Sequence, residues 1–164
     1  MFEAMHTGHS VYATVHADSI GETIKRLMYP PIEVPANLLS AVNLNVVMFR
    51  DRRKGLRRVL QVGEYIEAGE SGGVTVNPNI LYRWKADRDQ IIKHADSLKL
   101  KEDLTRLTGM TQKEINTDLK EKEKILLWMV KHKMRSIKSV GQVMDDYYLD
   151  PETILKKVTA GKKI

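Results

Sequence analysis

The spacing of apolar residues changes partway along the chain. Up to about residue 84 they form short runs and alternations typical of strands, at residues 11–16, 44–49, 56–67 and 74–84. From about residue 90 they recur every three or four positions, as in helices that bury one face. The pattern predicts an α/β chain with a soft boundary near residue 86, which separates residues 1–86 from a helical region at residues 87–164.

Local signals refine the first part. A short helix is expected to end at Gly8, and Ser19 and Glu22 have capping-box spacing for a helix after the strand at 11–16. The nearly continuous apolar run at 44–49 favours a strand covered on both faces, as in parallel sheets. Glycines within residues 68–73 favour a hairpin loop. We therefore expect part of a parallel sheet with an appended antiparallel β-ribbon.

The helical region has start signals of its own. Thr111 and Glu114 form a second capping box, and Asp150 followed by Pro151 is typical of an N-cap and a first-turn proline. A strand-dominated structure beyond residue 110 would contradict this prediction.

A histidine lies near each end of the first predicted strand. The segment Thr7-Gly8-His9-Ser10-Val11-Tyr12-Ala13-Thr14-Val15-His16-Ala17 resembles the histidine box of the secretion ATPase superfamily, which drives type II secretion and the assembly of type IV pili and archaeal flagella. Further segments resemble the archaeal-type branch in the same order: Ile24-Lys25-Arg26-Leu27, Pro31-Ile32-Glu33-Val34-Pro35, Leu44-Asn45-Val46-Val47, Arg57-Arg58-Val59, Glu64-Tyr65-Ile66, Leu81-Tyr82-Arg83-Trp84 and Asp146-Tyr147-Tyr148-Leu149-Asp150-Pro151.

The chain departs from that superfamily in one respect. The phosphate-binding pattern G-x-x-x-x-G-K-[ST] does not occur in its 164 residues. In the superfamily this P-loop precedes the histidine box, so the resemblance implies the C-terminal part of a RecA-like ATPase domain without its P-loop. ATP and Mg²⁺ are then expected only where the missing elements are supplied.

The resemblance also implies site residues. His16 and His9 match the box histidines near the γ-phosphate and are the expected catalytic residues, because an imidazole can exchange a proton near neutral pH. The expected nucleotide-binding residues are Thr7, Gly8, Thr14 and Arg26.

Residue types alone leave other interpretations open. His9 fits a capping role, His16 a structural role within a sheet, and Arg26 an ion pair with Glu22 four positions earlier. His6, His9 and His16 suggest a metal site only weakly, since a helix end at Gly8 would separate the first two. We expect no bound metal.

Partners and location follow from the resemblance as well. It implies a ring-like homo-oligomer that works with an inner-membrane assembly platform protein, at the cytoplasmic face of the membrane as a peripheral protein. Two alternatives are a non-enzymatic binding or assembly module derived from that fold and a basic nucleic-acid-binding domain. We expect no specific nucleic-acid partner.

Composition narrows these possibilities. The chain has no cysteine and therefore no disulfide or thiolate metal site. It also has no apolar run near the roughly 20 residues that a membrane-spanning helix needs. The formal net charge is +6, and the basic cluster at residues 50–58, which includes Arg50 and Arg58, could contact phosphate, an acidic subunit or lipid headgroups.

Overall fold

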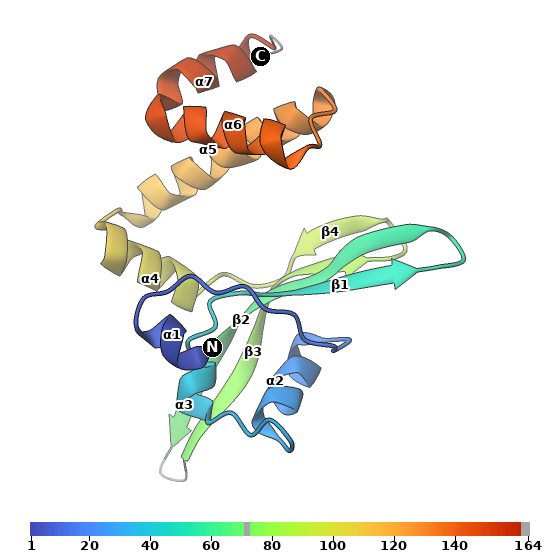
Figure 1. The fold of residues 1–164 in the computed structure, drawn as a ribbon, viewed down its shortest axis with the longest axis vertical. Helices are drawn as coiled ribbons and strands as arrows, with labels where there is room; N and C mark the ends of the chain where they lie inside the picture. Colours follow the sequence, from blue (N-terminus) through green and yellow to red (C-terminus); the bar gives the residue numbers. More distant parts are fainter. Residues whose placement is uncertain (71–72, 162–164) are drawn as a thin grey trace. The chain divides into compact units, whose positions relative to one another are not determined.

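The computed structural model describes residues 1–70 and 73–161. The chain forms two compact units, Met1–Asp103 and Leu104–Ile164 (Figure 1). The division falls later than the sequence boundary near residue 86, because a fourth strand and the first turn of the next helix belong to the first unit.

The first unit combines short helices with one antiparallel sheet. The sheet has four strands in the order β1-β2-β3-β4, and each strand pairs antiparallel with the next. The elements are α1 (Phe2–His6), α2 (Ile20–Met28), α3 (Ala36–Leu39), β1 (Asn45–Asp51), β2 (Leu56–Glu70), β3 (Gly73–Lys85) and β4 (Gln90–Lys93).

Helices α2 and α3 cover one face of this sheet. The apolar stripe of α2 packs with strand residues in a single buried cluster made of Ile20, Ile24, Leu27, Leu39, Val47, Tyr65 and Val76. A cross-strand row that includes Val47 and Gln61 lies on the covered face. The Gln61 side chain accepts a hydrogen bond from the backbone N–H of Ile20 at 3.1 Å, which fixes the start of α2 on the sheet.

Two predictions about strands are wrong. Residues 11–16 form no strand, because no described backbone group pairs with them, and a strand exists only as part of a ladder. The run at 44–49 is a strand, β1, but it lies antiparallel at the edge of the sheet rather than inside a parallel one. Of its apolar residues only Val47 is fully buried, while Val46 and Met48 are 50% and 65% exposed. A parallel, RecA-like sheet is absent from the described residues.

Other predictions are confirmed. The antiparallel ribbon at 56–67 and 74–84 corresponds to β2 and β3, which are paired up to Glu70 and Gly73. The middle of the expected glycine loop, residues 71–72, lies outside the described residues. Helix α1 ends before Gly8, whose positive φ of 87° suits glycine. Helix α2 begins at the predicted cap, Ser19.

The second unit is helical, as predicted for most of residues 87–164; the departure is β4, a strand at Gln90–Lys93 that pairs with β3. Helix α4 (Lys99–Thr108) crosses the division, and α5 (Gln112–Lys131), α6 (Ile137–Leu149) and α7 (Pro151–Thr159) follow. The capping box of Thr111 and Glu114 and the Asp150 cap are both present. The core of this unit consists of Ile125, Trp128, Met129, Val143, Tyr147 and Ile154. Among the described helices, none is long and apolar enough to cross a bilayer.

The close packing of α2 on β2 gives a first testable prediction. A Cβ atom on Gly63 would lie 2.6 Å from the backbone oxygen of Asn79 and 2.6 Å from Cδ1 of Ile20. We therefore expect Gly63→Ala to destabilise the first unit by about 1–3 kcal/mol, measured by urea unfolding. The matched control is Gly69→Ala on the same strand, where the added Cβ meets no atom within 4 Å. Equal stability of the two variants would contradict the prediction.

Candidate functional site

The two histidines expected to be catalytic lie on an exposed segment between α1 and α2. Residues 10–17 have the composition of a strand, yet no described backbone N–H or C=O group hydrogen-bonds with their main chain. Tyr12 is 99% exposed, and Thr14 and Val15 are also exposed. The segment therefore presents unpaired backbone groups and a strand-forming sequence to the solvent.

Hydrogen bonds hold the beginning of this segment to α1. The Thr7 hydroxyl donates to the carbonyl of Ala4 at 3.0 Å, and His9 Nδ1 lies 3.3 Å from the same oxygen and 3.1 Å from the Thr7 hydroxyl. His9 Nδ1 therefore lies within hydrogen-bond distance of two oxygens at the end of α1, and His9 is both a capping residue and an exposed imidazole.

No contact of this kind restrains His16. Its side chain is exposed, and no described residue hydrogen-bonds to its ring. The structural role within a sheet that residue types left open for His16 is therefore not seen. Both ring nitrogens of His16 are available to a group from outside the described chain.

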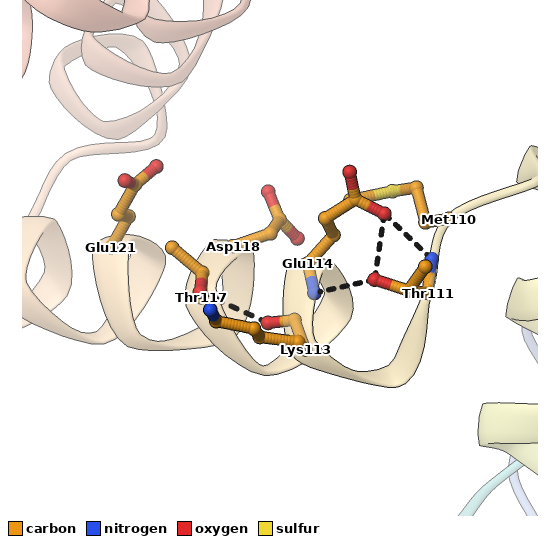
Figure 2. A pocket seen from close by; sticks show the side chains of 7 residues that line it. All are labelled: Met110, Thr111, Lys113, Glu114, Thr117, Asp118 and Glu121. Atoms are coloured by element: carbon orange, nitrogen blue, oxygen red, sulfur yellow. Dashed lines mark hydrogen bonds between the residues drawn. The ribbon is translucent and has the colours of Figure 1, made fainter.

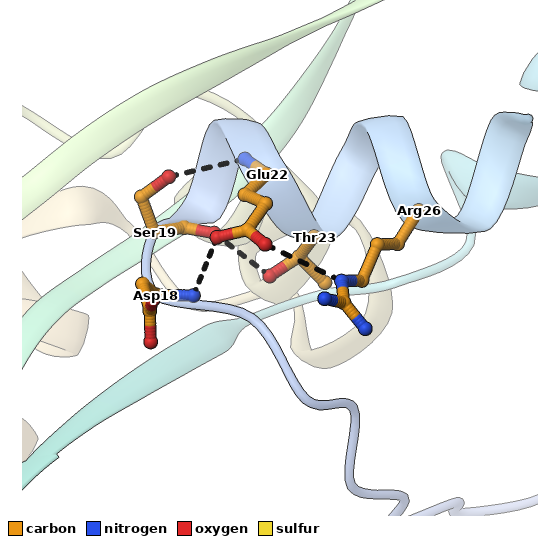
Figure 3. A network of polar contacts seen from close by, with 5 residues as sticks. All are labelled: Asp18, Ser19, Glu22, Thr23 and Arg26. Carbon is orange, nitrogen blue, oxygen red and sulfur yellow. Dashed lines mark hydrogen bonds and ion pairs between the residues drawn. The ribbon is translucent and has the colours of Figure 1, made fainter.

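A polar network fixes the other end of the segment (Figure 3). The Ser19 hydroxyl accepts from the N–H of Glu22 at 3.1 Å, and the Glu22 carboxylate accepts from the N–H of Asp18 at 2.8 Å. The same carboxylate pairs with Arg26 Nε at 3.3 Å. Chiefly the Asp18 hydrogen bond, with help from Arg26, lowers the pKa of Glu22 although desolvation opposes the shift. The carboxylate therefore stays ionised and keeps the start of α2 in place.

The expected site residues are only partly brought together. Thr7, Gly8 and His9 adjoin in one turn, whereas Arg26 lies on α2 and forms the ion pair with Glu22 that was the alternative for it. No described contact joins His9 to His16 or either histidine to Arg26. No group of three or more His, Asp or Glu side chains among the described residues is placed to hold a metal ion.

A second polar centre surrounds Glu64 of β2. The sequence alone predicts no role for it. This side chain is 0% exposed, and its carboxylate accepts hydrogen bonds from both side-chain and backbone donors. The donors, at 2.6–3.3 Å, are Asn79 Nδ2, Ser97 Oγ and the backbone N–H groups of Leu98, Lys99 and Leu100. Desolvation raises the pKa of Glu64, but these hydrogen bonds outweigh it and the net shift is downward. Glu64 thus holds the first turn of α4 against β2.

Lys99 extends this centre to α3. Its ammonium group donates to the carbonyl of Val42 at 3.2 Å and also to that of Ser40, the residue that ends α3. Burial lowers the pKa of Lys99, whereas Asp103, Glu64 and Glu67 act in the opposite direction. A cation at the carbonyl end of a helix is stabilising. The Glu64–Lys99 centre therefore joins β2, α3 and α4 and has no exposed reactive group.

A groove lined mainly by polar residues lies along the start of α5 (Figure 2). Its lining is Met110, Thr111, Lys113, Glu114, Thr117, Asp118 and Glu121. The carboxylates already serve the fold: Glu114 accepts from Thr111, and Asp118 pairs with Lys122 at 2.8 Å. Desolvation and the nearby Asp118 and Glu121 raise the pKa of Tyr147 to about 12. The Tyr147 hydroxyl donates to Asp118 and Glu121 at 3.3 Å, so these two carboxylates of the groove help to hold α6 on α5.

Comparison with known proteins places the chain beside archaeal relatives. The chain matches no known family profile. It is similar to three uncharacterised proteins of Methanocaldococcus jannaschii. One is 29% identical over 147 residues, which are 88% of this chain and 20% of the relative. Another is 30% identical over 154 residues, which are 90% of this chain and 27% of the relative. A third is 27% identical over 135 residues, which are 81% of this chain and 49% of the relative. The chain thus spans between a fifth and a half of the length of these relatives.

Proposed function

We propose that this chain is the C-terminal portion of a secretion or pilus-assembly ATPase of the archaeal-type branch. In this role it contributes a histidine-bearing segment to an ATP site that other sequence completes. The observation that carries the proposal is the exposure of two imidazoles, His9 and His16, together with the unpaired, strand-forming backbone of residues 10–17. The order of the motifs along the chain supports it as well.

The 164 residues alone do not supply the groups that bind ATP and Mg²⁺ in a P-loop ATPase. Nothing among the described residues replaces the lysine and the cradle of backbone N–H groups that a P-loop supplies. Thr7, Gly8, Thr14 and Arg26 do not converge on one point through any described contact. Nucleotide binding is therefore a property of the combined site, in which Mg²⁺ and the P-loop neutralise phosphate charge.

His16 and His9 have distinct roles in this combined site. His16, whose two ring nitrogens are free, can donate to a phosphate oxygen or accept from the attacking water. His9 is tied to Thr7 and Ala4 and mainly fixes the turn before the segment. The full assembly would be a ring-like homo-oligomer at the cytoplasmic face of the membrane, with an inner-membrane platform protein as its partner.

An ATPase measurement on the separate and combined parts tests this proposal. We expect the 164-residue chain alone to bind ATP weakly and to hydrolyse none, because it has no P-loop. When it is joined to a P-loop-bearing ATPase segment from the same genome, hydrolysis should appear. The P-loop segment alone is the control and should be inactive. Robust hydrolysis by the chain alone would contradict the proposal that other sequence is needed to complete the ATP site.

A non-enzymatic assembly module is the second candidate. The favouring observation is that each unit has a buried core of its own, one around Ile20 and Tyr65 and the other around Ile125 and Trp128. A chain with such cores can fold and bind partners without a nucleotide. Absence of hydrolysis in every combination with P-loop segments, together with stable complex formation, would favour this candidate.

A further inference from the structure

Nearly all of the net positive charge of the chain lies at one hairpin turn. Residues 50–58, here called the basic hairpin, join β1 to β2 and carry six basic side chains and one acidic one. Their formal net charge is +5, against +6 for the whole chain. Elsewhere basic and acidic residues nearly balance, so the basic hairpin dominates the electrostatic attraction of this protein for anions.

One arginine of the basic hairpin is neutralised within the fold. Arg58 binds the Asp89 carboxylate through Nε at 2.6 Å and Nη2 at 2.5 Å, and Trp84 Nε1 donates to the same carboxylate at 2.9 Å. The Trp84 ring stacks on Phe49 at a centroid distance of 5.4 Å. Chiefly the hydrogen bond from Arg58 lowers the pKa of Asp89 to about 2. These contacts attach the hairpin to the turn between β3 and β4.

The remaining cations are unneutralised. Arg50 lies directly opposite Arg57 in the β1–β2 ladder, where two like charges destabilise the pair. The Asp51 carboxylate accepts from the backbone N–H groups of residues 53 and 54 in the turn. Within the described part of the chain, no ion pair is formed by the exposed side chains of Arg50, Arg52, Arg53, Lys54 or Arg57. A bound anion would relieve the repulsion between Arg50 and Arg57.

Apolar side chains continue this surface along β1. Val46, Met48 and Arg50 alternate with inward-facing residues, so all three lie on the same face of the strand. Val46 is aligned across the sheet with Val62 and with Tyr82, which is 42% exposed. Val46 and Met48 are 50% and 65% exposed. A nucleic-acid backbone offers no partner for these aliphatic groups, whereas the boundary between lipid headgroups and acyl chains does.

We propose that this face of the basic hairpin docks on an anionic lipid bilayer. The four unneutralised arginines and Lys54 bind phosphate oxygens of the headgroups, with Arg50 and Arg57 sharing one or more phosphates between them. Met48 and Val46 enter the apolar boundary, and Tyr82 lies at the headgroup level. This docking does not depend on the ATPase proposal, because it uses none of the residues placed in the nucleotide site.

Binding of the intact chain to vesicles tests the proposal. We expect it to bind vesicles of phosphatidylcholine with 30% phosphatidylglycerol, weakening as salt rises, and not to bind pure phosphatidylcholine vesicles. The triple variant Arg52→Gln, Arg53→Gln, Lys54→Gln should bind about 100-fold more weakly. Met48→Ser should lower the affinity roughly threefold, because it removes one partly inserted side chain.

The matched control removes the same charge elsewhere. Lys120→Gln, Lys124→Gln, Lys131→Gln changes three exposed lysines of α5 and should leave vesicle binding nearly unchanged. Circular dichroism checks that every variant is folded. Three results would overturn the proposal: equal binding to neutral vesicles, an equal loss in the α5 variant, or tight binding to random duplex DNA that anionic vesicles do not compete away.

Discussion

Replacing His16 with alanine should slow ATP hydrolysis about 100-fold in the enzyme formed by this chain and a P-loop-bearing segment. That factor is the usual scale for the loss of one positioned proton-transfer or hydrogen-bonding group. Nucleotide affinity should change much less, because the P-loop supplies most of the phosphate contacts. Steady-state kinetics and nucleotide titration of the combined enzyme measure the two effects separately.

Two further variants make this measurement specific. His9→Ala should have the smaller effect, since the His9 ring is already held by Thr7 and Ala4. His94→Ala removes an exposed histidine just after β4 and should leave the rate unchanged. A combined enzyme that retains its full rate with His16→Ala would assign this residue no part in catalysis.

Replacing Glu64 with alanine should reduce the free energy of unfolding of the first unit by about 3–5 kcal/mol. The buried carboxylate accepts from two side chains and three backbone N–H groups, and these donors would remain buried without a partner. Urea unfolding followed by Trp84 fluorescence, in a Trp128→Phe background, measures this unit. Glu67→Ala, an exposed glutamate on the same strand, should cost less than about 0.5 kcal/mol.

The contribution of Glu64 should also depend on pH. Its pKa is lowered in the folded protein from the ordinary value of 4.5, so the unfolded chain takes up the proton first as the pH falls. The stabilisation is therefore complete above about pH 4.5 and is lost as the pH falls through the lowered folded pKa. The stability difference between the wild-type protein and Glu64→Gln should shrink over that range. A difference that stays constant with pH would contradict this account.

Elements with local signals could be predicted from the sequence. The caps at Ser19, Thr111 and Asp150 depend on residues three positions apart, and each helix begins where its cap predicts. The β2–β3 ribbon pairs two segments that are neighbours in the sequence and could be predicted for the same reason. Helix caps and hairpins depend on residues that lie close together in the sequence, so a local pattern is enough to predict them.

Strand pairing could not be predicted in this way. The composition of residues 11–16 suits a strand, but strand propensity only means that a segment fits a sheet if a partner is present. Among the described residues no such partner exists. An apolar run such as 44–49 likewise does not distinguish a central parallel strand from an antiparallel edge strand. Residues 46 and 48 are exposed because they lie on the face of β1 opposite Val47, whereas α2 and α3 pack on the Val47 face.

The candidate site could likewise be predicted only where its residues belong to a local motif. The histidines could be found because a local motif marks them, whereas Glu64 receives hydrogen bonds from residues 15 to 36 positions away. Its one sequence signal is a carboxylate within the apolar stretch Val62–Ile66, which is equally typical of a strand with one solvated face.

Glu64 makes the start of α4 part of the same cooperative unit as β2. Its buried carboxylate accepts from the backbone N–H groups of Leu98 and Leu100, which lie at the beginning of that helix. The first turn of a helix ordinarily frays, because its backbone N–H groups have no partner within the helix. Here those N–H groups bind a side chain of β2, so unwinding the turn would leave a buried carboxylate without its donors. The first turn of α4 is therefore expected to open only together with β2, and not as a free helix end.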